Sequence, residues 1–120
     1  MGTHAAIIQK VEDGYKGIYL HWDGYPEYAG KMLEEHYTSN DKVTDLINLG
    51  SLSQLKREPN PKEVLEHSFS QPESDVCIAY HRDRGESLDI FYGSTVEEVS
   101  DRIAYGEYTY VYEDGKWNLV

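Results

Sequence analysis

Two short patterns in the sequence place residues capable of acid–base or metal chemistry side by side. The stretches His21-Trp22-Asp23 and His81-Arg82-Asp83 each carry a histidine two positions before an aspartate. Both fall at the ends of expected strands, where residues two apart project to the same face. Together the four side chains could bind a divalent metal, or each carboxylate could orient its imidazole. One candidate function is therefore a small metal-dependent hydrolase.

Neither pattern is accompanied by the rest of a familiar catalytic or metal site. No closely spaced ligand extends His21 and Asp23 or His81 and Asp83 into a larger set, and His-x-Asp arises readily by chance. Phosphate-binding glycine loops, serine-nucleophile elbows, His-Glu-x-x-His and Cys-x-x-Cys are absent from the sequence. We therefore expect no catalytic residue, no bound metal and no cofactor. Whether the two pairs meet in one pocket is a question for the structure.

The first pattern also has an architectural interpretation. Alternating apolar residues predict that Trp22 ends a strand with its ring in the core, and Asp23-Gly24 tolerates the positive φ of a turn. Pro26 fixes φ where a helix can begin, Glu27 adds a negative charge to its first turn, and Asp23 could cap it. This reading predicts one structural motif, comprising His21, Trp22, Asp23, Gly24, Tyr25, Pro26 and Glu27.

The same run resembles a His-Trp-Asp-Gly-Tyr-Pro motif of short proteins that bacteriophages and prophages carry widely. The resemblance covers residues 4–37 and extends to the stretch Ala79–Glu86. That family has no assigned chemistry, so the resemblance implies an origin and not a reaction. It suggests a phage or prophage accessory protein, with an anti-defence role of the anti-CRISPR kind as one form.

Composition limits the class of protein. The 120 residues carry 22 acidic and 11 basic side chains, a formal net charge of −11, which disfavours direct nucleic-acid binding. The length and the apolar content predict a single domain over residues 1–120. No apolar run approaches the ~20 residues that span a bilayer, and no signal peptide is recognisable. We expect a protein of the bacterial host cytoplasm, in which the lone Cys77 is a buried thiol.

The end of the chain concentrates acidic residues and tyrosines. Acidic charge speeds encounters with a positive cleft, and tyrosines anchor protein interfaces. We expect a partner-binding surface made of Glu97, Glu98, Asp101, Tyr105, Glu107, Tyr108, Tyr110, Tyr112, Glu113 and Asp114. The expected function is non-enzymatic inhibition of a host nucleic-acid-binding protein, such as a CRISPR effector or another defence nuclease, by acidic residues that occupy the place of nucleic acid.

Two alternatives to these assignments remain open. Tyrosines 108, 110 and 112 alternate along one strand, so they could line the edge of the core instead of an interface. Arg82 and Arg84 could clamp an anion in a small-ligand or nucleotide-signal binding protein, or they could form surface ion pairs with Asp83 and Glu86.

The elements that must position these residues follow from hydrophobic periodicity and turn signals. Strands are expected at 5–11 and 15–22, joined by the hairpin signal Glu12-Asp13-Gly14, and then at 75–81, 88–92, 108–112 and 117–120. Helices are expected at 26–37, at 41–49, capped by Ser39, Asn40 or Asp41 and stopped by Gly50, and from Val96, after a Thr95 cap, to before Gly106. Asp114-Gly115 is expected to turn the last hairpin, and 51–74 is expected to be irregular. This order predicts an α+β fold, with a mostly antiparallel sheet built from hairpins and helices covering one face.

Overall fold

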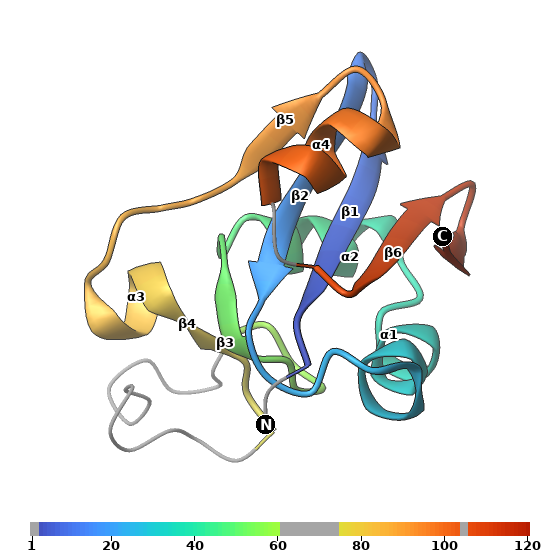
Figure 1. Cartoon of the computed structure of the whole chain (residues 1–120). Helices are drawn as coiled ribbons and strands as arrows, with labels where there is room; N and C mark the ends of the chain where they lie inside the picture. Colours follow the sequence, from blue (N-terminus) through green and yellow to red (C-terminus); the bar gives the residue numbers. More distant parts are fainter. Residues whose placement is uncertain (1–2, 61–74, 104–105) are drawn as a thin grey trace.

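An antiparallel hairpin forms the centre of the fold (Figure 1). The structure is a computed structural model that describes residues 3–60, 75–103 and 106–120. Strand β1 (Ala5–Val11) pairs with β2 (Gly14–Leu20) in a register that sets Val11 opposite Gly14. The hairpin that the turn signal predicts is thereby confirmed.

Seven strands form one mixed sheet around this hairpin. The order along the main path is β4-β3-β2-β1-β6-β7, and β5 pairs with β2 beside this path. Among the named strands of the described residues, the pairs β1–β6 and β2–β3 are parallel and the other four pairs are antiparallel, so the expected α+β class with a mostly antiparallel sheet is confirmed. The remaining strands are β3 (Leu52–Gln54), β4 (Ile78–Ala79), β5 (Phe91–Gly93), β6 (Tyr108–Glu113) and β7 (Lys116–Leu119).

Two strands share the edge of β2 that faces away from β1. Strand β5 pairs with the first half of β2, up to Gly17, whereas β3 pairs with its last residue, Leu20. Figure 1 shows β5 and β3 diverging from this edge. Between them the backbone N–H of Tyr19 donates to the Ser51 hydroxyl, at 3.4 Å. The sheet is therefore split at its edge beside Tyr19.

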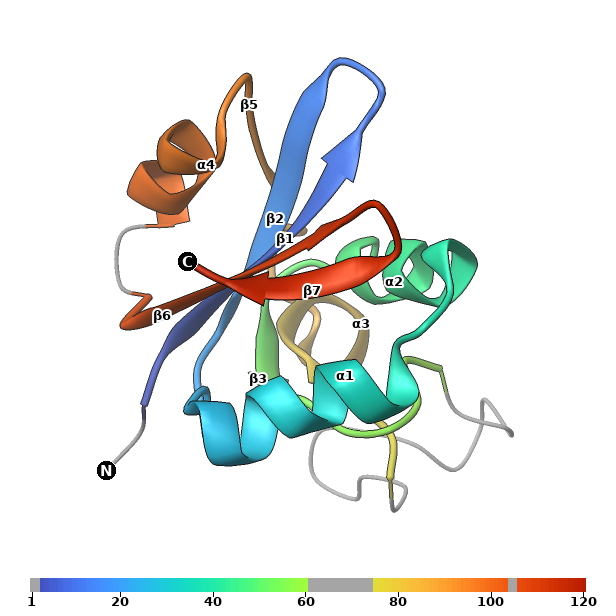
Figure 2. The same cartoon turned by 90° about the vertical axis from the view of Figure 1, so that its right-hand side faces the viewer.

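Helices cover both faces of the sheet, as Figure 2 shows. The π-helical turn η1 (Pro26–Gly30), α1 (Lys31–His36) and α2 (Asn40–Ile47) lie on one side, and α4 (Val96–Ile103) lies on the other. The short α3 (Tyr80–Arg84) follows directly from β4. The sequence analysis expected helical cover on one face, and α4 extends that cover to the second.

The sequence of β1 explains this two-sided cover. Ala5 and Ile7 belong to the larger core, on the side of α1 and α2, whereas Ala6 and Ile8 belong to a smaller core beneath α4. All four side chains are fully buried. An unbroken apolar run is typical of a strand that is buried on both faces. The smaller core consists of Ala6, Ile8, Val99, Ile103 and Val111.

Several turns and caps form as the sequence predicts. The Ser39 hydroxyl accepts the Lys42 N–H at 3.2 Å and begins α2, and Gly50 lies just after that helix with a φ of +78°. The Thr95 hydroxyl accepts the Glu98 N–H at 3.1 Å and begins α4. Asp114 and Gly115 both have positive φ, as a tight two-residue hairpin requires.

The middle of the chain departs from expectation. Part of the stretch expected to be irregular forms β3 inside the sheet, while residues 61–74 of that stretch lie outside the described part. The expected strand at 75–81 is only β4, because α3 begins at Tyr80. The Asp83 carboxylate explains this early helix start, since it accepts the Ala79 N–H at 2.8 Å. Strand β5 begins later than expected, at Phe91.

Candidate functional site

The glycine of the His-Trp-Asp-Gly-Tyr-Pro run fixes the loop between β2 and η1. The Gly24 N–H donates to the Thr3 carbonyl at 2.7 Å, and the Gly24 carbonyl accepts the Tyr110 hydroxyl at 2.7 Å. A Cβ at Gly24 would lie 2.8 Å from the Thr3 oxygen and 2.7 Å from the Ala5 Cβ. A side chain at this position would clash with Thr3 and Ala5, so the loop requires a glycine here. The positive φ expected here falls on Asp23, at 57°.

Trp22 does not fill the core, which corrects the architectural interpretation. Its side chain is 40% exposed, and its ring meets the His21 ring edge-on with centroids 4.7 Å apart. Strand β2 ends at Leu20, so the alternation that would turn Trp22 inward stops before it. The N–H groups of His21 and Trp22 then donate to the carbonyls of Leu52 and Ser53. Trp22 is consequently a surface residue.

The helix start that the motif predicts is correct in part. Pro26 occupies the first turn of η1 and Glu27 supplies its acidic charge, as expected. The residue that precedes the helix is Tyr25, however, and no side chain makes a capping hydrogen bond there. Asp23 is therefore not the cap. Tyr25 is 36% exposed, so the loop presents two aromatic side chains to the surface.

His21 belongs to a cluster that includes His4. The two imidazole rings stack with centroids 4.7 Å apart, and the His4 Nδ1 donates to the His21 carbonyl at 2.7 Å. The Tyr19 hydroxyl lies 3.0 Å from the His21 Nδ1. Burial, and then the neighbouring His4, lower the pKa of His21. Local spacing could not reveal this pair, because the β1–β2 register brings together residues 17 positions apart in sequence.

The second His-x-Asp pair serves local structure. His81 and Asp83 lie on a helix and not on a strand, and His81 Nδ1 donates to the Glu86 carbonyl at 2.8 Å. Asp83 accepts from Ala79 N–H and pairs with Arg82 at 2.8 Å. The described contacts do not bring this pair to His21 and Asp23. Within residues 3–60, 75–103 and 106–120, no three His, Cys, Asp or Glu side chains gather as metal ligands.

The Arg82 guanidinium is hydrogen-bonded within the protein and is not placed to bind an anion. Its guanidinium donates to the carbonyls of Pro59 and Cys77, each at 2.7 Å, and to the Asp83 carboxylate. Arg84 forms an ion pair with Glu86 at 3.1 Å. The anion-binding alternative is therefore not supported by Arg82, whose donors are directed to the protein itself.

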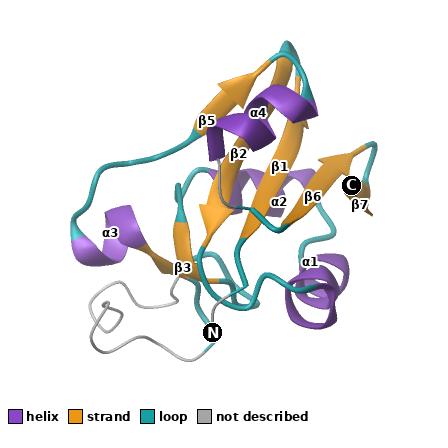
Figure 3. Cartoon of the chain, viewed as in Figure 1, coloured by secondary structure: helices purple, strands orange, loops and turns teal. Residues whose placement is uncertain are grey.

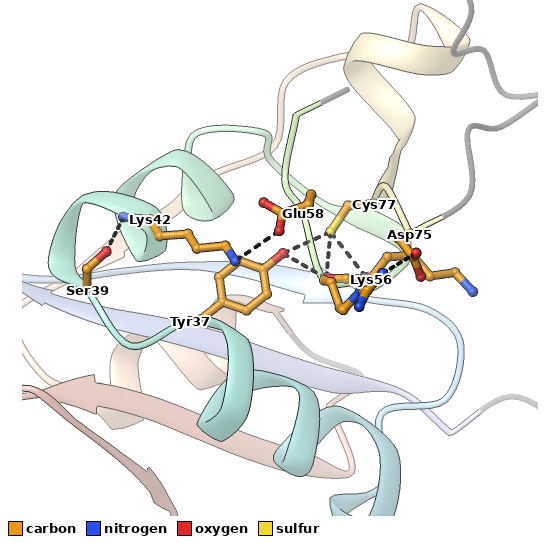
Figure 4. A network of polar contacts seen from close by, with 8 residues as sticks. Tyr37, Ser39, Lys42, Lys56, Glu58, Asp75 and Cys77 are labelled. Atoms are coloured by element: carbon orange, nitrogen blue, oxygen red, sulfur yellow. Dashed lines mark hydrogen bonds and ion pairs between the residues drawn. The ribbon is translucent and has the colours of Figure 1, made fainter. Parts of the chain in front are cut away.

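The single cysteine is part of a buried polar network (Figure 4). The Tyr37 hydroxyl donates to the Lys56 carbonyl at 2.8 Å and lies 3.3 Å from the Cys77 sulfur, which also accepts the Lys56 N–H. Burial raises the pKa of the Cys77 thiol and of the Tyr37 hydroxyl, so both stay protonated near neutral pH. The expected buried thiol is confirmed, and its contacts are structural.

Two of the tyrosines expected at an interface belong to the core. Tyr110 and Tyr112 are 3% and 5% exposed, and Tyr108 packs partly buried against the same cluster. Burial raises the pKa of Tyr110 to about 12. Tyr110 and Tyr112 therefore line the core, as the alternative interpretation of the alternating tyrosines predicted. They are not part of an exposed contact surface. Tyr105 lies outside the described residues.

The acidic residues of α4 remain on the surface. Glu97, Glu98 and Asp101 are exposed, while Val99 and Ile103 face the smaller core. Glu98 has a local role as well, because its carboxylate accepts the Ser94 N–H at 2.8 Å. A cleft of about 290 Å³ opens beside this helix, and we call it the α4 cleft. It is lined by Val96, Glu97, Ser100, Asp101, Thr109 and Val120.

A second cavity of about 290 Å³ lies where β5 and β3 diverge from β2, and we call it the split-edge cavity. Its walls come from β2, from the residue before β3, from α3, from the connection between α3 and β5, from β5 itself, and from α4. The lining residues are Tyr19, Ser51, Tyr80, Glu86, Asp89, Phe91 and Ile103. The sequence analysis did not identify this cavity, because its residues share no motif and are assembled by the sheet topology.

The split-edge cavity brings together residues of two stretches that are separate in sequence, residues 4–37 and Ala79–Glu86. Tyr80 and Glu86 belong to the second stretch, and the hydroxyl of Tyr19 contacts His21 of the first. Comparisons with protein-family models, with curated proteins and with solved structures found no match to this chain. The fold and its cavities are therefore the basis for any functional assignment.

Proposed function

We propose that this chain is a non-enzymatic phage or prophage accessory protein of the host cytoplasm. In this proposal it binds the basic nucleic-acid-binding surface of a host protein, such as a CRISPR effector or another defence nuclease, and inhibits it. The observation that carries the proposal is the α4 cleft, in which acidic residues flank an opening suited to a cationic side chain.

The cleft combines the two features that bind lysine or arginine. Glu97 and Asp101 are one helical turn apart and exposed, so their carboxylates lie on one face of α4. Val96 and Val120 supply apolar surface for an aliphatic stem, and Val120 is 75% exposed. A partner's side chain could bury its stem on the valines and place its charge at the carboxylates.

Charge outside the cleft supports the same function. The chain carries −11 net charge, and none of the described residues lining the α4 cleft is a cation. Long-range attraction of this kind raises the rate of association with a positive surface and weakens as salt is added. The proposed contact surface retains Glu97, Asp101, Glu107 and Asp114, which are all exposed.

Two acidic residues of the expected surface have structural partners. Glu98 accepts from Ser94 N–H at the start of α4, and Glu113 accepts the Tyr15 hydroxyl at 2.9 Å. Replacing either residue would disturb the fold as well as the surface. A clean test of the proposal therefore changes only Glu97 and Asp101.

The test compares two variants with the same change in net charge. Glu97→Lys with Asp101→Lys alters the α4 cleft, whereas Glu12→Lys with Asp13→Lys alters the exposed tip of the β1–β2 hairpin. Binding to a purified, guide-loaded CRISPR effector and inhibition of its DNA cleavage are measured with each variant. We expect the cleft variant to lose about tenfold or more in affinity and the tip variant to lose much less.

Salt dependence gives a second measurement on the parent protein. Affinity should fall between about 0.01 M and about 0.1 M salt, over which the Debye length shrinks from about 30 Å to about 10 Å. A folded cleft variant that inhibits as well as the parent would overturn the assignment of the α4 surface. Failure of the parent to bind any nucleic-acid-binding effector would overturn the function itself.

A ligand-binding function is favoured by a different observation, the split-edge cavity. The metal-dependent hydrolase receives no such support, because the described contacts of His21 and His81 are with different neighbours.

A further inference from the structure

We propose that the split-edge cavity binds a small organic cation, with an ammonium or guanidinium head and an apolar body. This site is distinct from the α4 cleft, and it does not depend on the proposed inhibitory function. Three properties support the inference: the aromatic lining of the cavity, the carboxylates in its wall, and the rigid attachment of the segment that carries those carboxylates.

Three of the seven described residues that line the cavity are aromatic. Tyr19, Tyr80 and Phe91 are all partly buried, and each comes from a different secondary-structure element. Ile103 adds apolar surface from the end of α4. Aromatic faces attract cations through their quadrupole, and they also accept the apolar body of a ligand. A lining of this kind favours an organic cation over a hydrated metal ion.

Two carboxylates give the cavity its charge. Glu86 and Asp89 line it, and none of the described lining residues is basic. Glu86 forms an ion pair with Arg84 in which both side chains are about half exposed, at 49% and 57%, so water screens it. The Asp89 carboxylate accepts the Ser87 hydroxyl at 3.3 Å. The charged group that fits this wall is therefore positive, which is the opposite of the anion expected from Arg82 and Arg84.

The segment that carries the carboxylates has no helix or strand, yet it is attached at several points. Figure 3 shows it as the loop between α3 and β5. His81 Nδ1 donates to the Glu86 carbonyl at 2.8 Å, and the Ser51 hydroxyl donates to the Asp89 carbonyl at 3.4 Å. A Cβ at Gly50 would lie 2.8 Å from the Leu88 Cδ1. These contacts hold the acidic wall in place before a ligand arrives, which reduces the entropic cost of binding.

The size of the cavity limits its ligand. A volume of about 290 Å³ lies at the lower end of the range for small-molecule sites, which begins at about 300 Å³. A single ring or short alkyl chain with one cationic head suits this space better than a nucleotide. The same head group could be presented by an arginine of a protein, so the experiment includes both sources.

Benzylamine is the first probe, because it joins an aromatic body to an ammonium head. Its neutral analogue benzyl alcohol and its anionic analogue benzoate serve as matched controls. Binding is followed by amide chemical shifts in two-dimensional NMR. We expect benzylamine to shift the signals of Tyr19, Ser51, Tyr80 and Phe91, benzyl alcohol to bind about tenfold more weakly, and benzoate not to bind. Acetyl-arginine methylamide tests the protein-borne source.

Variants separate the cavity from the general acidity of the protein. Glu86→Gln with Asp89→Asn should weaken benzylamine binding by about tenfold, since both carboxylates lose their charge. The control, Glu12→Gln with Asp13→Asn, makes the same charge change at the hairpin tip and should leave binding unchanged. Phe91→Leu, which keeps an apolar side chain without a ring, should weaken binding as well.

Three results would overturn the inference. The first is that benzylamine and benzyl alcohol bind with equal affinity. The second is that the control variant loses as much benzylamine binding as the cavity variant. The third is that the chemical-shift changes are confined to residues outside the cavity. Stronger binding of acetyl-arginine methylamide than of benzylamine would support the cation site and assign its ligand to a protein side chain. None of these outcomes bears on the α4 cleft, so the two proposals stand or fail separately.

Discussion

The two faces of the sheet differ in the size of the core that packs against them. On the side of α1 and α2, the larger core contains apolar residues from the helices and from most of the strands, and it includes buried tyrosines whose hydroxyls are hydrogen-bonded. On the side of α4, five buried residues form the smaller core. Both acid-lined cavities proposed as sites lie against α4. The larger core thus makes the larger contribution to stability, and both proposed binding sites lie on the face of the smaller core.

This division follows from the length of the covering elements. Segment η1 with α1, together with α2, packs against one face, whereas α4, with eight residues, packs against the other. The α4 cleft and the split-edge cavity both lie beside this single helix. The comparison predicts that mutations of equal chemistry will have unequal effects on the two faces.

The largest effect should come from truncating a side chain of the larger core. Ile7 and Ile8 are adjacent in β1, both fully buried, and they face opposite sides of the sheet. We expect Ile7→Ala to lower the free energy of unfolding by about 3–5 kcal/mol and Ile8→Ala by about 2–3 kcal/mol. The smaller core can relax around the lost methyl groups more easily. Urea denaturation of both variants measures the difference, and equal losses would contradict the division.

Removing one buried hydrogen bond should have an intermediate effect. Tyr110 belongs to the larger core, and its hydroxyl donates to the Gly24 carbonyl at 2.7 Å. Tyr110→Phe keeps the ring and leaves that buried carbonyl without its donor, which should cost about 1–2 kcal/mol. Tyr108→Phe, at a partly buried neighbour, is the control and should cost less. If Tyr110→Phe were as stable as the parent, the attachment of the motif loop to the core would be unimportant.

A smaller effect is expected for Trp22, despite its size. With a side chain that is 40% exposed and placed beyond the end of β2, Trp22→Ala should cost less than about 1 kcal/mol. A buried tryptophan, as the alternation of the sequence suggests, would cost about 3–5 kcal/mol. Thermal melting distinguishes these values directly. A loss in the larger range would show that the ring is packed in solution.

The sequence predicted most elements and missed what depends on tertiary contacts. Turn chemistry at Ser39, Gly50, Thr95 and Asp114-Gly115 predicted boundaries correctly, because each signal acts through its own backbone. Strand β3 was missed because three residues carry too little periodicity, and only the edges of β2 and β4 define it. Neither cavity was foreseen as a cavity, although two acidic residues of the α4 cleft were expected at the surface.

The aromatic residues illustrate the same limit. Alternation placed tyrosines 108, 110 and 112 on one face correctly, but it could not say whether that face was covered. Cover came from the loop before η1, whose Gly24 carbonyl accepts the Tyr110 hydroxyl, and from η1, where a Cβ at Gly30 would lie 3.4 Å from the Tyr110 ring. Trp22 lies two residues beyond Leu20, the last residue of β2, where alternation no longer holds. Burial is a property of what packs opposite a strand, so it cannot be derived from the strand alone.

The smallest predicted effect concerns pH and the stacked histidines. Burial first, and then His4, lower the pKa of His21 in the folded protein below its usual 6.5. The unfolded chain therefore binds a proton at His21 before the folded protein does. The stabilising contribution of neutral His21 is present above about pH 6.5, and it is lost as pH falls through the lower, folded pKa.

An NMR titration of the imidazole C–H signals measures that pKa. We expect His4→Gln to raise the pKa of His21 in part, because burial remains, and we expect His36→Gln, on α1, to leave it unchanged. A His21 pKa at or above 6.5 in the parent protein would show that the stacked pair is not held in solution as the structure describes.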